Sequence, residues 1–256
     1  MFTNEKPERR SHRGFGARTL LAVIIAGTLH TGFAETPGAP AFDSPDQAIE
    51  ALCVAVNKDN GAAITQLIGP LASSGDMVQD KADRELFIRK FSEMHRLVKE
   101  QDESMVLYIG AENWPFPVPL VSDHGKWRFD QHAGAQEITF RRIGENEMTA
   151  IETCRAIAHP EGATENTAIK DYVRKGVGAA PPPSEPFHGY YYRVVRTSDG
   201  TIVVAYPAEY GVTGVMTFAV TPIGAVYEKD LGLKTIGVAR AMLQFKPNRT
   251  WHTAEQ

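Results

Sequence analysis

The chain has 256 residues, of which 43% are hydrophobic, so it holds enough apolar material for one or two globular domains with cores of their own. Its formal net charge is −4 and no basic stripe offsets it, which excludes nucleic acid as a partner because such a surface repels phosphate backbones. Beyond the N-terminal residues, no stretch is long and apolar enough to span a bilayer.

Residues 1–34 have the pattern of an export signal. A basic start is followed by a short apolar run at 20–26, and small residues at 32–34 offer a cleavage site before Glu35. The basic residues are Lys6, Arg9, Arg10, Arg13 and Arg18. An uncleaved membrane anchor is the alternative, and the shortness of the apolar run argues against it. Removing this segment takes away five of 27 basic and two of 31 acidic residues and leaves a net charge of −7, so we expect a periplasmic or secreted protein.

Cys53 and Cys154 are the two cysteines of the chain. An even pair in an oxidising compartment favours a disulfide, which here closes a loop of about a hundred residues. Each cysteine also lies on the apolar stripe of a predicted helix, where the thiol side chain behaves as a small hydrophobe. Both interpretations stay open. Two cysteines alone cannot form a zinc site, and the sequence predicts no metal and no cofactor.

An α+β unit is predicted over residues 42–140, after a Pro-rich connector at 35–41. A cap and proline at Ser44-Pro45 start a first helix, a second covers 62–68, and a third runs from about Asp80 to Val98. Strands follow at 105–110, 116–121 and 126–130, with Asp123-His124-Gly125 as a tight turn. Helices followed by a curved antiparallel sheet resemble the cone-shaped fold of nuclear transport factor 2 and ketosteroid isomerase.

A second α+β unit is predicted over residues 141–250, with 251–256 as a tail. A helix at 145–157 and further helical turns at 163–173 precede a linker at 176–183. Antiparallel strands follow, with hairpin turns at 198–200 and 221–224, and a helix at 236–243 ends the unit. A helix that backs a small antiparallel sheet resembles the globular part of type IV pilins and pseudopilins. The hydrophobic assembly helix of pilins is missing upstream, so the resemblance does not extend to polymerisation.

Several ordered runs of the sequence resemble one bacterial family, the domain-of-unknown-function family 2950. The runs are 42–45 with Ala48, 73–76, 114–121, 127–130, 141–156, 188–193, 205–218 and 227–232. This resemblance covers nearly all of the chain after the signal and implies an exported bacterial protein. It supplies no catalytic residues. The segment between His159 and Phe187 is shorter than the family pattern, and the loop at 197–200 is abbreviated.

Among catalytic patterns, the chain has no G-x-S-x-G elbow, no phosphate-binding loop and no H-E-x-x-H. Ser73 and Ser74 next to Gly-Asp are typical of turns. The polar set with the best chemistry is Asp123, His124 and Asp130, with His132, Trp114 and Trp127 nearby in the sequence. A His–Asp pair between aromatic walls can perform acid–base catalysis. The competing interpretation is that Asp123 and His124 only form a hairpin turn.

The tyrosine-rich strand is the candidate binding surface. Tyr190 and Tyr192 share one face of this strand, and Tyr191 and Arg193 share the other. One face must be core, and the other presents aromatic and cationic groups unless the sheet is packed on both sides. The binding candidates are His188, Tyr191, Arg193, Glu209 and Tyr210. We therefore expect a non-enzymatic envelope protein that binds a protein or polymer through its sheet surfaces. The alternative is a small hydrolase or isomerase with a pocket in the first unit.

Overall fold

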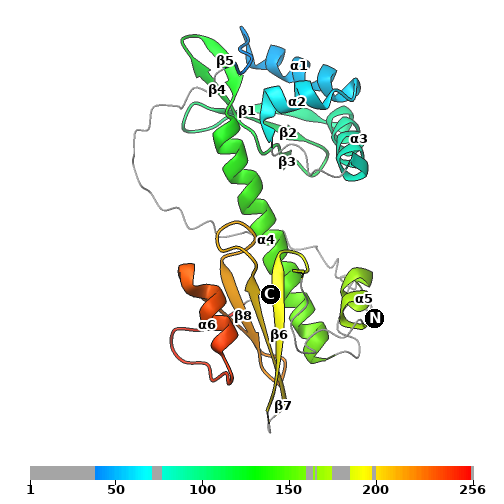
Figure 1. The fold of residues 1–256 in the computed structure, drawn as a ribbon. Coiled ribbons are helices and arrows are strands. Elements are labelled where there is room, and N and C mark those ends of the chain that lie inside the picture. Colours follow the sequence, from blue (N-terminus) through cyan, green and yellow to red (C-terminus); the bar gives the residue numbers. More distant parts are fainter. Residues whose placement is uncertain are drawn as a thin grey trace, which may run out of the picture. The chain divides into compact units, whose positions relative to one another are not determined.

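The computed structural model describes residues 38–70, 77–159, 164, 166–174, 185–197 and 200–254. The predicted signal, the Ser73-Ser74 loop and the predicted linker lie outside these residues. The described part of the chain consists of helices and two antiparallel sheets, which confirms the α+β class (Figure 1).

Three helices open the described chain: α1 (Pro45–Asn57), α2 (Gly61–Ile68) and α3 (Met77–Glu93). Ser44 caps α1, where its hydroxyl accepts a hydrogen bond from the Gln47 amide and Pro45 occupies the first turn, as predicted. The Asn60 side chain caps α2 in the same way. Helix α3 is shorter than predicted, because its last residue is Glu93 and the predicted continuation to Val98 is wrong.

The first sheet has the order β1-β2-β4-β5, and β3 pairs with β2. Its strands are β1 (His95–Lys99), β2 (Met105–Ile109), β3 (Trp114–Pro115), β4 (Leu120–Asp123) and β5 (Lys126–Phe129). Strand β1 replaces the predicted end of the third helix, because all five of its residues pair antiparallel with β2. The predicted strand at 116–121 is wrong in its bounds: pairing occurs on either side of a bend at 116–119, as β3 and β4.

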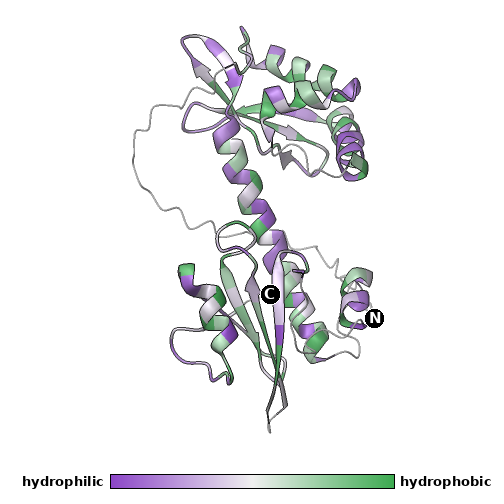
Figure 2. Ribbon diagram, viewed as in Figure 1, coloured by the Kyte–Doolittle hydropathy of each residue, from purple (hydrophilic) through white to green (hydrophobic). Residues whose placement is uncertain are grey.

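The first core lies between the helices and the first sheet. Helix α1 contributes its regularly spaced apolar face, of which Leu52 and Ala48 are almost fully buried, and β2 and β4 contribute Leu107 and Leu120. Phe87, Phe91 and Trp127 pack against this core from α3 and β5 while remaining partly exposed. The apolar stripes of Figure 2 follow these buried positions.

Helix α4 (Gln131–Ala158) is one continuous helix where the sequence predicts a new segment from residue 141. At its start, the Gln131 amide donates to the carbonyl oxygens of Gln66 and Leu67 in α2. Further along, Asn146 donates to the carbonyl oxygen of Thr213, and Ala150 lies in the core of the second sheet. The predicted boundary at 140/141 therefore falls inside a helix that contributes contacts to both sheets, and the division into two domains stays a prediction.

The second sheet has the order β10-β9-β8-β7-β6. Its strands are β6 (Tyr190–Thr197), β7 (Gly200–Pro207), β8 (Met216–Val220), β9 (Val226–Asp230) and β10 (His252–Thr253). The predicted turn at 221–224 connects β8 to β9, with Gly224 at positive φ and its amide bonded to the Thr221 carbonyl. The predicted tail contains β10, which pairs with β9 and so belongs to the sheet.

Both faces of the second sheet are covered. On one face, Tyr190, Tyr192 and Phe218 pack with Ala150 and Cys154 of α4. On the other face, Val204 and Tyr206 pack with Ala239 of α6 (Thr235–Ala241). Helix α5 (Thr167–Arg174) adds Tyr172 to the α4 side, and a 3-10 turn, η2 (Gly232–Lys234), precedes α6. The cone-like and pilin-like resemblances stay predictions about finer fold relationships.

Candidate functional site

Asp123 and His124 form the exposed turn between β4 and β5. His124 adopts positive φ, and its side chain is 94% exposed, with Nδ1 2.7 Å from Oδ1 of Asp123. A side chain with that exposure has no walls to hold a substrate or exclude water from a reaction. The positions of Asp123 and His124 therefore fit the interpretation that they only form a hairpin turn.

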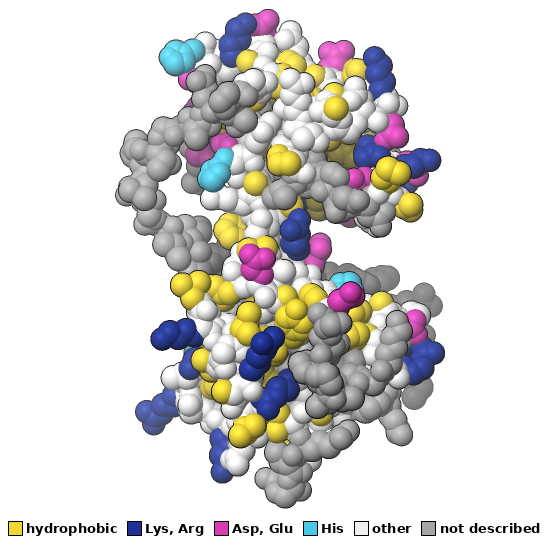
Figure 3. Space-filling view, in the orientation of Figure 1, with side chains coloured by type: hydrophobic (Ala, Val, Ile, Leu, Met, Phe, Trp, Pro, Cys, Tyr) yellow, Lys and Arg dark blue, Asp and Glu magenta, His cyan; other side chains and the backbone are white. Residues whose placement is uncertain are grey.

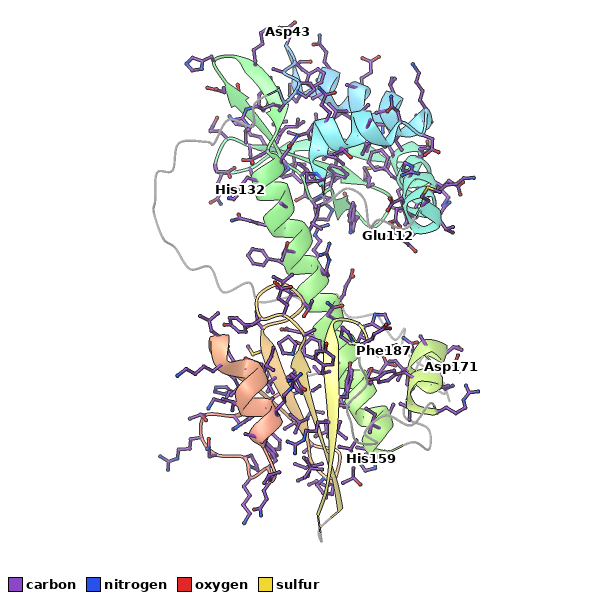
Figure 4. The ribbon with its side chains drawn as sticks, in the orientation of Figure 1. Asp43, Glu112, His132, His159, Asp171 and Phe187 are labelled. Carbon is purple, nitrogen blue, oxygen red and sulfur yellow. The ribbon has the colours of Figure 1, made fainter. Side chains whose placement is uncertain are left out.

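Asp130 serves a different purpose from the pair at the turn. Its Oδ1 accepts hydrogen bonds from the backbone amides of His132 at 3.1 Å and Ala133 at 3.0 Å, which makes it the N-cap of α4. His132, labelled in Figure 4, is exposed in the first turn of that helix. The Asp130 carboxylate therefore hydrogen-bonds the backbone of the helix that it caps.

Arg193 binds the end of α6, the helix that covers its face of the sheet. One of its guanidinium nitrogens, Nη1, donates to the carbonyl oxygens of Ala239 at 3.3 Å, Arg240 at 2.8 Å and Met242 at 2.6 Å. These carbonyls lie at the C-terminal end of α6, where helical carbonyls lack partners and a cation is favourable. Tyr191 on the same face is half-buried, with its ring 5.8 Å from that of Tyr206. The two-sided packing considered from the sequence is the arrangement found.

The remaining binding candidates lie in turns of the second sheet. His188 has positive φ in the turn that joins Phe187, labelled in Figure 4, to β6. The Glu209 amide donates to the Thr213 hydroxyl. The Tyr210 hydroxyl donates to Oδ2 of Asp230 at 3.1 Å, so it ties the turn before β8 to the end of β9. These contacts give each turn a structural role and leave partner binding there as a prediction.

Both cysteines are free thiols, so the bridge considered from the sequence is absent from the structure. Cys53 packs against the first core and Cys154 is fully buried in the second, as the small-hydrophobe interpretation predicts. Burial, assisted by the Glu50 carboxylate, raises the pKa of the Cys53 thiol to about 11. Burial also raises the pKa of Cys154. Neither thiol is an activated nucleophile at neutral pH, because the reactive form is the thiolate.

A groove of about 500 Å³ lies beside the first core. Its apolar lining comes from Ile49, Phe91, Leu97 and Leu107, of which Ile49 and Leu107 are buried. Its polar lining consists of Asp46, Glu50 and Cys53 from α1, and His95 and Arg96 from β1. Helix α1 presents Asp46, Glu50 and Cys53 together because they are spaced by four and three residues along one face.

His95 lies at the junction of α3 and β1. Its ring stacks on that of Phe91 at 3.9 Å, and its Nδ1 is 3.0 Å from the Phe91 carbonyl oxygen. A carbonyl accepts only from a protonated ring nitrogen, so the neutral imidazole carries its proton on Nδ1 and a lone pair on Nε2. Arg96 points to the opposite side of the strand, where its guanidinium lies over the Tyr108 ring and bonds Asn113.

Strand β1 is an edge of the first sheet, and part of its backbone has no hydrogen-bond partner among the residues that the structure describes. The Glu100 amide donates to the Ser104 carbonyl oxygen. In an antiparallel pair every second residue is hydrogen-bonded to the partner strand, so counting back from Glu100 the β1 residues bonded to β2 are 98 and 96. The backbone groups of His95, Leu97 and Lys99 therefore point away from β2, toward the open edge. The hydrogen bonding of Leu107, which lies opposite Leu97, supports this assignment, because its carbonyl oxygen accepts from the Phe116 amide and not from β1.

Two carboxylates stand beside this edge without partners. Asp46 and Glu50 are both exposed, and neither has an ion pair within the described ranges of the chain. The groove thus combines an apolar floor, an acidic rim on α1 and free backbone donors and acceptors on β1. Of its residues, only Cys53 was named as a candidate from the sequence, as one half of the disulfide considered there, and none was among the catalytic or binding candidates.

The described residues contain neither a cluster of metal ligands nor a membrane-spanning helix. In that part of the chain, no group of three or more His, Cys, Asp or Glu side chains is placed to hold a metal ion. None of the helices in the same residues combines the length and the apolar content of a membrane span.

The fold and groove define an α+β protein with an open sheet edge beside an acidic, apolar-floored groove. A family model described as "Protein of unknown function (DUF2950)" matches residues 39–177 and 197–254, and the chain belongs to this family. The tyrosine-rich run at 188–193, quoted above for the resemblance, falls between the matched ranges. Neither the search of curated proteins nor that of solved structures returned a match.

Proposed function

We propose that this protein is a non-enzymatic binding protein of the bacterial envelope that holds an extended segment of another polypeptide in the α1–β1 groove. The supporting observation is the backbone of His95, Leu97 and Lys99, which has no partner in the described part of the chain and lies at a sheet edge that borders the groove. A strand from another chain can pair with such an edge through main-chain hydrogen bonds, and the groove then selects among the side chains of that strand. Export is supported by the basic and apolar pattern of residues 1–34.

The groove also indicates the sequence of its occupant. Side chains alternate along a strand, so those on the inner side meet the apolar floor formed by Ile49 and Leu107. The unpaired carboxylates of Asp46 and Glu50 line the same groove and favour positive charge. The favoured partner is an extended segment in which apolar residues alternate with lysine or arginine.

A peptide that alternates Val and Lys serves as the probe, with a Val–Glu peptide as its control. We expect calorimetric binding of the first peptide and none of the second. Lys99→Pro removes an amide that points to the open edge, which edge strands tolerate, and should abolish binding. Lys99→Ala keeps the amide and should bind as the wild type does. Equal binding by the two variants would exclude strand addition.

Charge reversal tests the acidic rim separately. Glu50→Lys should weaken binding of the Val–Lys peptide by about tenfold, because an attractive charge becomes repulsive. Glu145→Lys changes the net charge equally on an exposed position of α4 and should leave binding unchanged. Affinity capture from the cell envelope then identifies the natural partner. Recovery of the protein alone would count against the proposal.

A small hydrolase or isomerase is the second candidate, and the observation in its favour is His95. The lone pair on Nε2 suits a general base, and the ring lines a groove rather than an exposed turn. The test compares wild type with His95→Gln on a panel of activated esters and enolisable ketones. Turnover that disappears in the variant would support the enzyme, and equal background rates in both would remove it.

A further inference from the structure

The segment around α6 has a composition unlike the rest of the chain. Between Leu231 and Ala254 there are four basic residues and no acidic residue, in a protein whose formal net charge is −4. The basic residues are Lys234, Arg240, Lys246 and Arg249, and all four are exposed. Charge is therefore segregated, with positive charge gathered on the side of the second sheet that α6 covers.

Large aliphatic side chains are exposed among these cations. Leu233 is 92% exposed and Leu243 is 71% exposed, while Ile236 and Val238 are 37% and 43% exposed. Helix α6 buries Thr235 and Ala239, and Met242 just after it is partly buried against the same core, so the outward side of α6 carries the other apolar residues. Figure 3 shows hydrophobic side chains and Lys or Arg side chains together over the region of α6. We call this surface the α6 face.

We propose that the α6 face binds the surface of a bilayer that contains anionic phospholipid. Exposed aliphatic side chains bounded by basic residues match an interface of acyl chains beneath negative headgroups. Leu233 and Leu243 enter the headgroup boundary, and Lys234, Lys246 and Arg249 contact lipid phosphates. An acidic protein would explain the cations but would leave leucines of this exposure without an apolar partner.

This surface is separate from the groove and places the protein against a membrane while the groove remains available. Arg240 is tied to the fold, because its Nε approaches the Tyr206 hydroxyl and its carbonyl accepts from Arg193. Lys229 likewise donates to Thr250. Lys234 and Lys246 have no such contact among the described residues, so these two cations are the ones to change.

Flotation with vesicles tests the proposal on protein purified from its own cell envelope, with its N-terminus determined by mass spectrometry. We expect binding to vesicles of phosphatidylcholine mixed with phosphatidylglycerol, weak binding to pure phosphatidylcholine, and release by salt. Leu233→Ser with Leu243→Ser should weaken binding about tenfold or more. Lys234→Glu with Lys246→Glu should do the same for the mixed vesicles only.

Matched variants separate a specific face from general stickiness. Ile223→Ser removes an aliphatic side chain that is 88% exposed in the β8–β9 turn. Lys58→Glu with Arg89→Glu reverses two exposed charges, one just after α1 and one on α3. Both should bind as the wild type does. Because every variant carries the same N-terminus, a retained signal segment cannot produce a difference between them.

Three results would overturn the proposal. The first is equal binding to both vesicle types, and the second is wild-type binding by the α6-face variants with unchanged thermal unfolding. The third is binding to polyglutamate, or self-association by sedimentation, that depends on these residues while vesicles are not bound. That last result would assign the face to an acidic polymer or to a second copy of the chain.

Discussion

Asp123 ends β4 and Asp130 directly follows β5, yet of the two only Asp130 caps a helix. Its two hydrogen bonds to the amides of His132 and Ala133 begin α4. Asp130→Ala should therefore lower the free energy of unfolding by about 1 kcal/mol, the usual loss for an N-cap. Urea denaturation measures this change. Asp123→Ala, at the exposed turn, serves as the control and should shift stability by less than about 0.5 kcal/mol.

Two glycines respond oppositely to the same substitution. A β-carbon at Gly214 collides with the hydroxyl and ring of Tyr190, which is fully buried and donates to the Met216 carbonyl. Gly214→Ala should cost about 2 kcal/mol or more, because a packed core cannot yield. A β-carbon at Gly144 meets open space within α4, so Gly144→Ala should stabilise by roughly 0.5–1 kcal/mol. Thermal unfolding that moves both variants in one direction would contradict this assignment.

The cysteines make a prediction that depends on pH. The pKa of Cys53 rises from an ordinary 9.0 to about 11, so near pH 8 the folded protein holds roughly a hundredfold less thiolate there than an unfolded chain does. Iodoacetamide should label Cys53 correspondingly slowly, with the rate rising as pH approaches 11. Mass spectrometry resolves the two sites. Absence of labelling in urea without reductant would instead reveal a disulfide.

At the scale of elements, the first two helices and the β4–β5 hairpin were predictable because their signals are local. A serine cap with proline in the first turn, and an Asp-His-Gly turn between alternating residues, each specify a conformation within a few residues. The third helix was extended wrongly because Phe91, Met94 and Leu97 fit helical spacing. Strand β1 forms there through pairing with β2, which is a tertiary contact that helical spacing does not encode.

The groove was missed for the same reason. The prediction placed His95 in a helix and therefore had no edge strand there. Without that strand, nothing in the sequence indicated that His95, Asp46 and Glu50 line one groove. The available signal was the short run His95 to Lys99 itself, in which apolar residues at 97–98 stand between polar residues, a length that suits a strand. Tyr191 and Arg193 were overvalued for a related reason, since the helix that covers their face lies far along the chain.

Helix α6 depends on Arg193 for its C-terminal end. One guanidinium nitrogen donates to the carbonyl oxygens of Ala239, Arg240 and Met242, and its removal takes this donor from all three, although Ala239 keeps the Met242 amide. Arg193→Met keeps the aliphatic stem and should lower stability by about 1.5–3 kcal/mol. It should also expose the bond after Arg240 to trypsin. Arg240 is the one trypsin site within α6, so Arg193→Met combined with Arg240→Gln should lose that cleavage.

At the scale of the whole molecule, α4 is the element that both sheets share. Its first turns bond to α2, while Glu147 accepts hydrogen bonds from the amides of Val215 and Met216, each at 2.9 Å, at the start of β8. The buried clusters of the two sheets have no residue in common. Each sheet therefore has a buried core of its own, and we expect the two cores to melt separately although the helix between them is unbroken.

Calorimetry tests this independence through Glu147. We expect two heat-absorption transitions, and Glu147→Ala should lower only the one that belongs to the second sheet, by roughly 1–3 kcal/mol, because two part-buried amides lose their acceptor. Leu52→Ala removes a side chain that is 1% exposed in the first core and should lower only the other transition, by about 2–5 kcal/mol. If either variant shifts both transitions equally, α4 couples the sheets into one cooperative unit, and the division of the chain near residue 140 has no thermodynamic meaning.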